Sequence, residues 1–198
     1  MKNISIVITF FMFVVLAVQE TNAESRSWDL DKNHSNIYFS VPHIFSDIRG
    51  SFDEFSGKFA FDSKNLSESV LHFKIKTKSV NTNVSKRDKH LRSGDFFDSG
   101  NHPLIVFEST EVTTTNDDIF LFAGKLQIKG IEYDLVLPLT LIGIKNHPME
   151  KGKDVLGFTG KVTLDRLTHK IGTGKFMDYG VVGKDVEVTV SVELLSDR

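Results

Sequence analysis

The residue types that could bind a polar ligand concentrate in segment 85–97, which reads Ser-Lys-Arg-Asp-Lys-His-Leu-Arg-Ser-Gly-Asp-Phe-Phe. Arg87, His90 and Arg92 bring two guanidinium groups and an imidazole close together in the sequence. These groups donate hydrogen bonds to anionic and polar partners. We therefore expect the three side chains at the mouth of a cavity, contacting the head group of a ligand, with Asp88 orienting the segment internally.

The same segment carries the signals of a short helix. Ser85 suits the N-cap position, Asp88 lies in the first turn, and Gly94 suits the end of the helix. About two turns of polar helix are marginal in water. Leu91 and the pair Phe96-Phe97 should therefore anchor the segment on one end of a β-structure. The alternative is that it only closes that end, with its charges in water.

No catalytic or metal-binding residue is predicted. The seven histidines form no His-x-His or His-Glu-x-x-His pattern, and we saw no histidine beside a carboxylate at ligand spacing. The sequence has no Gly-x-Ser-x-Gly motif of the kind that positions a serine nucleophile. It also has no cysteine, which excludes thiol catalysis and cysteine-ligated metal.

Composition and the N-terminal residues indicate an exported chain. Residues 1–23 resemble a signal peptide, with Lys2, an apolar core at 4–18 and small residues before a cleavage site. Residues 24–198 suffice for a single domain. An exported chain without cysteine fits a periplasmic location. The net charge of −2, with both signs interspersed, argues against a nucleic-acid partner.

The elements that would position the candidate residues are β-strands. Eight segments are typical of β-strands, at 37–41, 50–61, 70–80, 103–110, 119–128, 133–142, 155–165 and 186–192, and in most of them apolar and polar residues alternate with a period of two. No βαβ period connects them, so we expect antiparallel pairing. The prediction is an all-β fold, an eight-stranded antiparallel barrel with a short helix after strand 3.

Phenylalanine is abundant on the inward parity of these strands. The chain has 17 Phe against one Trp and three Tyr, which supplies apolar volume with few polar groups. Gly57, Gly124 and Gly160 share this parity, and either leave room for a tunnel or let the strands bend. The side chains that we expect to line a tunnel are Phe39, Val41, Phe55, Phe59, Phe73, Ile75, Phe107, Phe122, Leu126, Phe158 and Val162.

The segment 133–142 differs from the other strands because it is apolar on both faces. A strand of this kind should be covered on both sides, and Pro138 suggests an edge or a bulge. A second copy of the chain would provide the outer cover. The segment therefore predicts a homodimer as one mode of association.

Several patterns occur together along the chain, and the block Arg-Asp-x-His-Leu-Arg-Ser followed by Phe-Phe is the most specific of them. The matching positions are Trp28, Asp31, His34-Ser35, Phe39, Val41, His43, Gly50, Phe52, Phe55, Gly57, residues 87–93, Phe96-Phe97, His102-Pro103, Phe107, Ser109-Thr110, Gly124, Leu126, Ile128 and Gly130. With these residues, nearly the whole chain after residue 23 resembles the YceI-like family. Residues 169–172, His-Lys-Ile-Gly, depart from the family, which usually has an aromatic residue nearby.

The resemblance implies a lipocalin-like barrel, exported in bacteria, that holds a long isoprenoid or similar amphipathic lipid in its interior, often as a dimer. On this basis we expect no enzyme and no cofactor, but a bound polyisoprenoid or quinone-like lipid, as a carrier or store, with transient membrane contact. Two alternatives stay open. One is an enzyme acting on such a lipid, and the other is an interaction module that dimerises through strand 133–142.

Overall fold

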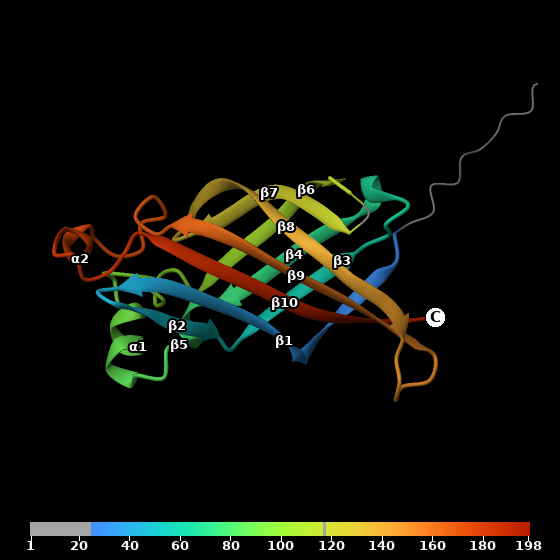
Figure 1. The fold of residues 1–198 in the computed structure, drawn as a ribbon, viewed down its shortest axis with the longest axis horizontal. Coiled ribbons are helices and arrows are strands. Elements are labelled where there is room, and N and C mark those ends of the chain that lie inside the picture. Colours follow the sequence, from blue (N-terminus) through green and yellow to red (C-terminus); the bar gives the residue numbers. More distant parts are fainter. Residues whose placement is uncertain (1–24, 117) are drawn as a thin grey trace, which may run out of the picture.

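The computed structural model describes residues 25–116 and 118–198, and the expected signal peptide at 1–23 lies outside them. The chain forms one antiparallel sheet that closes on itself where β10 pairs with β1 (Figure 1). The strands are β1 (Ser27–His43), β2 (Ser46–Phe52), β3 (Phe55–Ala60), β4 (Val70–Lys76), β5 (Val80–Asn81), β6 (Leu104–Thr114), β7 (Ile119–Ile128), β8 (Ile131–Asn146), β9 (Lys153–Asp165) and β10 (Asp185–Asp197). The α-helices are α1 (Ser85–Leu91) and α2 (Lys175–Asp178), with single 3-10 turns at Leu66–Glu68 and Thr77–Ser79.

The predicted barrel of eight antiparallel strands is confirmed. β2 and β3 follow one another along β1 and pair with its second and first halves, so they form one interrupted strand. β4 and β5 form another, because β4 pairs with β3 and β5 pairs with β2. The ten strand segments therefore make eight barrel strands, and the short helix α1 follows the third of them as predicted.

Three local features differ from what the sequence patterns predicted. The first strand is longer than the expected segment 37–41, because β1 runs from Ser27 to His43 and Pro42 pairs with Asp47 in β2. Ser85 is not the N-cap of α1. The N-cap is Val84, no side chain caps the helix, and Ser85 is its first residue. A second helix, α2, lies between β9 and β10, and the sequence patterns did not predict it.

Two inward glycines serve strand approach rather than a tunnel. A Cβ atom on Gly124 would lie 2.0 Å from the backbone oxygen of Glu108, and one on Gly160 would lie 2.1 Å from that of Pro138. Both clashes are with backbone, which cannot move aside cheaply. The missing side chain at these two positions therefore permits the close approach of a neighbouring backbone.

The barrel is solid at the end that carries the C-terminus (Figure 1). Phe61 lies edge to face with Phe120 and Phe158, at centroid distances of 4.9 Å and 5.0 Å. Phe122 packs edge to face on Phe158 at 6.0 Å, and Trp28 donates its indole hydrogen to the carbonyl of Phe61 over 3.1 Å. These side chains are almost fully buried, so large rings fill this end of the barrel.

The faces of β8 are distinct. Leu137 and Leu139 point into the core, with 7% and 1% exposure, whereas Val136 and Ile142 are 50% and 67% exposed. The apolar outer face expected from the sequence is therefore present in part, at Val136 and Ile142, with Pro138 and Thr140 between them. Among the described residues, no helix has the length and apolar character needed to cross a membrane.

Candidate functional site

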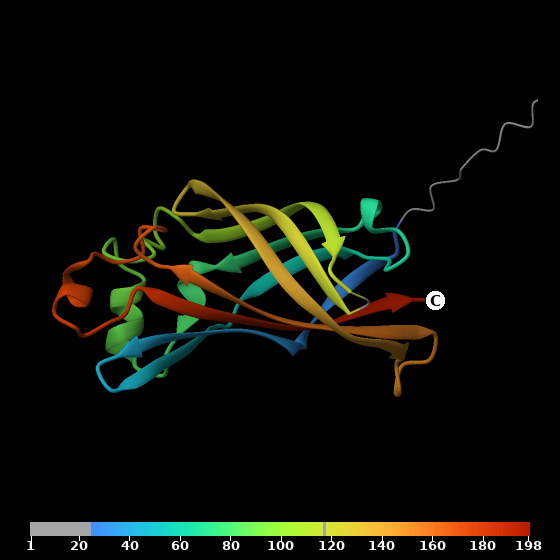
Figure 2. The same cartoon turned by 45° about the horizontal axis from the view of Figure 1, so that its top comes forward.

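The opposite end of the barrel is hollow. A cavity of about 380 Å³ lies between the barrel wall and the elements that cover this end, namely α1 and the connection that carries α2. Both helices lie at this end in the two views (Figures 1 and 2). The volume is within the range of about 300–1,000 Å³ that is usual for small-molecule sites.

Most of the cavity wall is aliphatic or aromatic. The barrel contributes side chains from β1, β2, β6, β7, β9 and β10, and the cover contributes Leu91, Phe96, Phe97, Phe176 and others. The anchors predicted for segment 85–97 therefore also form the cavity wall. The polar groups are few, and they are Thr82, Arg87, Arg166 and the imidazoles of His43, His90 and His169.

Arg87 borders the cavity and also holds α1 in place. Its Nε donates to the hydroxyl of Thr82 over 2.7 Å, and its Nη2 donates to the Thr82 carbonyl over 2.8 Å. The buried Asp88 carboxylate accepts from the Thr82 amide over 2.9 Å and from its hydroxyl over 2.5 Å. Asp88 thus orients the segment from within, and Arg87 has structural partners beside any contact with a ligand.

The other two expected mouth residues differ in position. His90 lines the cavity, packs edge to face on Phe96 at 4.9 Å, and lies 3.2 Å from the carboxylate of Asp95. Arg92 is not part of the cavity wall. Its Nη2 donates to the carbonyl of Val80 over 2.9 Å, which ties the end of α1 to β5.

Two of the expected tunnel residues line the cavity, and the other nine do not. Phe39 and Val41 line the cavity. The other nine pack in or against the core outside the cavity wall: Phe55, Phe59, Phe73, Ile75, Phe107, Phe122, Leu126, Phe158 and Val162. Their inward orientation follows from the alternation, but alternation does not reveal where along the barrel the interior is filled.

Arg166 was missed by the sequence reading. It is 5% exposed and donates to the carbonyls of Gly183, Ile171 and Val182, over 2.7, 3.1 and 3.3 Å. Burial lowers the pKa of its guanidinium. Gly172 packs against it with φ +76°, where a Cβ would lie 2.8 Å from the guanidinium. This arginine folds the 166–183 connection over the cavity, and a single Arg after a strand gave no signal of this.

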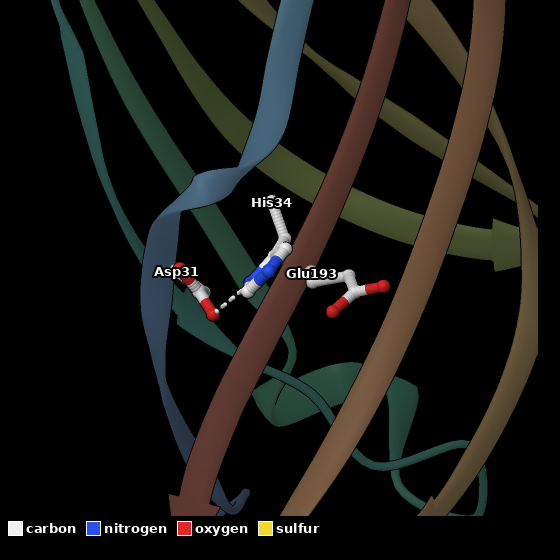
Figure 3. Close-up of side chains that lie close together, drawn as sticks. All are labelled: Asp31, His34 and Glu193. Atoms are coloured by element: carbon white, nitrogen blue, oxygen red, sulfur yellow. Dashed lines mark hydrogen bonds and ion pairs between the residues drawn. The ribbon is translucent and has the colours of Figure 1, made fainter.

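A second group of polar side chains lies outside the cavity, where β1 and β10 run side by side (Figure 3). Asp31, His34 and Glu193 each place a potential ligand atom within 4.8 Å of the others. The carboxylate of Asp31 lies 2.7 Å from Nδ1 of His34. This hydrogen bond lowers the pKa of Asp31 and raises the pKa of His34.

The sequence patterns did not predict that His34 pairs with a carboxylate. The register between β1 and β10 shifts between Asp31 and Asn36, so the extra residues bulge and turn His34 back towards Asp31. Glu193 comes from the far end of the chain. Because Asp31 and His34 already satisfy one another, their arrangement is explained without a metal.

Known proteins resemble this chain over most of its length. The model of the family described as "YceI-like domain" matches residues 28–194. A UPF0312 protein of Pseudomonas paraeruginosa is 38% identical over 174 residues, which cover 86% of this chain and 87% of that protein. A UPF0312 protein of Pectobacterium atrosepticum is 37% identical over 172 residues, 86% of each chain.

Solved structures share the fold. BcnA of Burkholderia cenocepacia has a TM-score of 0.74 at 21% identity and covers 83% of this chain and 99% of its own. A Campylobacter jejuni YceI protein has a TM-score of 0.68 at 25% identity, covering 78% and 88%. A polyisoprenoid-binding domain from Saccharophagus degradans has a TM-score of 0.62 at 12% identity, covering 87% and 99%.

The family model extends over nearly the whole barrel, from the start of β1 into β10. The two curated relatives agree with it, since each aligns with this chain over most of both lengths. This chain therefore belongs to the YceI-like family.

Proposed function

We propose that this protein binds a lipid whose apolar tail, isoprenoid or similar, occupies the cavity beneath α1 and α2. The observation that carries the proposal is a cavity of about 380 Å³ with a mostly apolar wall and a few polar side chains. Burial of a tail contributes about 0.8 kcal/mol per methylene, so high affinity does not require many specific polar contacts with the ligand. Arg87 and His90 are the groups that would contact the head group.

One structural neighbour supports the proposal, and the position of the cavity limits how much of the tail it holds. The Saccharophagus degradans neighbour is described as a polyisoprenoid-binding domain, although at 12% identity it shares the fold alone. Nine expected tunnel residues lie outside the cavity wall, which is confined to one end of the barrel. We therefore propose that the inserted part of the tail is shorter than the barrel and that any remainder of a long ligand stays outside the mouth.

The test is to extract the purified protein with organic solvent and to identify co-purified lipids by mass spectrometry. An isoprenoid-type lipid in near-stoichiometric amount is expected. If the extract contains no lipid and the protein does not bind farnesol added from ethanol, the proposal is wrong. Incubation of the loaded protein tests the enzyme alternative, because a change in the mass of the lipid would indicate turnover.

We further propose that the protein acts in the periplasm, as a carrier or store, after removal of residues 1–23. The support is the charged, apolar and small-residue order of that segment. Fractionation of cells that express the full chain should place the protein in the periplasmic fraction with an N-terminus near residue 24. A chain without residues 2–23 should stay in the cytoplasm, and equal export of both would contradict the proposal.

A second candidate function is association through β8. Val136 and Ile142 are 50% and 67% exposed along β8, and a second copy of the chain would bury them. Val136→Lys should convert a dimer into a monomer in light scattering without loss of bound lipid. A monomeric wild type would contradict this proposal. The charge belongs at Val136, because Leu137 faces the core and its substitution would unfold the protein.

A further inference from the structure

The turn between β1 and β2 exposes two large apolar side chains at the hollow end of the barrel. Phe45 is 101% exposed and Ile44 is 59% exposed. No other large hydrophobic side chain among the described residues is as exposed as Phe45. Turns that are exposed to water favour Gly, Asn, Asp or Ser instead. The burial of apolar surface on folding therefore does not explain why Ile44 and Phe45 stand in this turn.

The backbone of this turn is also strained. His43 pairs with Ser46, which leaves Ile44 and Phe45 as a two-residue loop. Ile44 has φ 51° at the first loop position, where hairpins prefer glycine. A β-branched residue with positive φ is an outlier, and such strain concentrates at functional sites. Two adjacent positions thus favour exposed apolar surface over local stability.

The turn is joined to the cover of the cavity. The amide of Ile44 donates to the carbonyl of Val181 over 3.2 Å, and the amide of Gly183 donates to the carbonyl of Pro42 over 2.9 Å. His43 also forms a β-bridge with Val182. His43, Val181 and Val182 line the cavity. The exposed tip is therefore a continuation of the cavity wall rather than an independent loop.

The neighbouring helix α2 adds side chains that suit a lipid–water interface. Tyr179 is 67% exposed and Met177 is 38% exposed. The amine of Lys175 lies 6.0 Å from the centre of the Tyr179 ring. Tyr and Lys are residues that anchor proteins at this interface, since each combines an apolar body with a polar tip. Asp178 on the same helix offsets the charge of Lys175.

The shape of this surface fits a bilayer better than a protein partner. A stable protein interface buries about 1,200–2,000 Å² and needs a complementary surface. Here two side chains project from a tight turn beside one short helix. A bilayer accepts apolar side chains without shape complementarity. β2 carries Asp47 and Arg49, and α2 carries Lys175 and Asp178. Because these elements carry both signs of charge, apolar insertion must supply the affinity rather than attraction to anionic lipids.

We propose that the surface formed by Ile44, Phe45, Met177 and Tyr179 docks on a lipid bilayer, with Phe45 inserted among the acyl chains. This inference rests on the proposed function, because docking turns the cavity mouth towards the membrane from which a lipid tail enters. The proposal thereby assigns specific residues to the membrane contact that we expected from the family resemblance.

The first test measures co-flotation of the purified protein with phosphatidylcholine vesicles, with and without a minor fraction of phosphatidylglycerol. Phe45→Ser should weaken vesicle binding by about tenfold, as loss of one buried phenyl group implies. The matched control is Met149→Ser. Met149 is 86% exposed in the β8–β9 loop, at the opposite end of the barrel (Figure 1), and its substitution should change nothing. Equal binding by wild type and Phe45→Ser overturns the proposal.

Ile44→Gly separates docking from a structural role. Glycine relieves the strain at φ 51°, so the melting temperature should rise by a few degrees while vesicle binding falls. If Ile44 served folding, the melting temperature would fall instead and vesicle binding would be unchanged. That result contradicts the proposal.

Farnesol distinguishes failure of docking from failure of lipid binding. Phe45 lies outside the cavity wall, so Phe45→Ser should bind farnesol added from ethanol as wild type does in calorimetry. It should take up farnesol from loaded vesicles at least about tenfold more slowly. Equal uptake rates overturn the docking proposal. No farnesol binding by either protein, with vesicle binding still dependent on Phe45, would overturn lipid binding and leave docking supported.

Discussion

The two ends of the barrel have the same backbone architecture and opposite interiors. Around Phe158 the aromatic rings of β7, of β9 and of Phe61, which follows β3, interlock, and Val192 and Leu194 of β10 are 2% and 0% exposed. Around Val188, a little earlier on the same strand, the inward side chains border a cavity. The difference is that the second end is closed by α1 and a folded connection, not by large side chains from the strands.

The comparison teaches that stability and binding are separated along the barrel axis. The packed end buries large rings at the density of a protein core, which stabilises the fold. The hollow end gives up that packing and depends on hydrogen bonds, from Arg166 to the connection and from Arg87 to Thr82, to keep its cover in place. Substitutions at the two ends should therefore have different consequences.

The largest expected effect comes from the same substitution at the two ends. Phe158→Ala should lower the free energy of unfolding by about 3–5 kcal/mol, because it removes a buried ring from the packed cluster. Phe176→Ala, in the cavity cover, should cost less than about 2 kcal/mol, since Phe176 is only half-buried. Urea denaturation measures both. Equal costs would show that the two ends are packed alike.

Substitutions that add side-chain volume at the two ends of the barrel give the reverse comparison. Val188 and Val192 lie on the same face of β10, but Val188 borders the cavity and Val192 contacts the packed core. Val192→Phe should cost about 1–3 kcal/mol through overpacking. Val188→Phe should change stability by less than about 1 kcal/mol and weaken farnesol binding about tenfold, by occupying the site. If Val188→Phe leaves farnesol binding unchanged, the tail binds elsewhere.

Loss of one hydrogen-bonding group tests how the cover is held. Arg87→Ala removes two hydrogen bonds to Thr82 and should lower the free energy of unfolding by about 1–2 kcal/mol. Lys86→Ala is the control, because Lys86 is exposed on the same helix. Thermal unfolding and farnesol binding are measured together. A variant with normal stability and lost binding would assign Arg87 to the ligand alone.

The smallest effect concerns the Asp31–His34 pair, which lies outside both interiors. The raised pKa of His34 contributes stability below its ordinary pKa of 6.5 that is lost as pH rises through the raised value. The lowered pKa of Asp31 contributes stability above 3.8 that is lost as pH falls through the lowered value. The pair is therefore most stabilising between these limits.

His34→Ala should accordingly lower the melting temperature more at about pH 5.5 than at about pH 8.5. Asp31→Asn should remove most of this pH dependence, because it removes the partner that shifts the histidine. The effect is small, since the His34 side chain is 65% exposed and solvent screens the pair. A larger loss at the higher pH would contradict the assignment.

Particular residues show how far the sequence predicts the site. The alternation of apolar and polar residues correctly predicted that the side chains of Phe39, Val41, Phe122 and Phe158 point inward, because a period of two is a local property of a strand. It could not separate the first two, which line the cavity, from the last two, which fill the core. Segment 85–97 was recognised as a cover of the barrel end because its apolar anchors are adjacent in the sequence.

By itself, the sequence determined the class of fold, the antiparallel order of eight strands and the place of α1, since patterning and chain connectivity are local signals. Only the tertiary structure decided which end is hollow, that Arg166 holds the cover, and that His34 meets Asp31 and Glu193. The hollow end and the approach of Glu193 depend on residues from distant parts of the chain. Arg166 and His34 meet residues nearer in the sequence, but only because the connection folds back and β1 bulges. Their packing in space, rather than any spacing in the sequence, sets where the interior stays open.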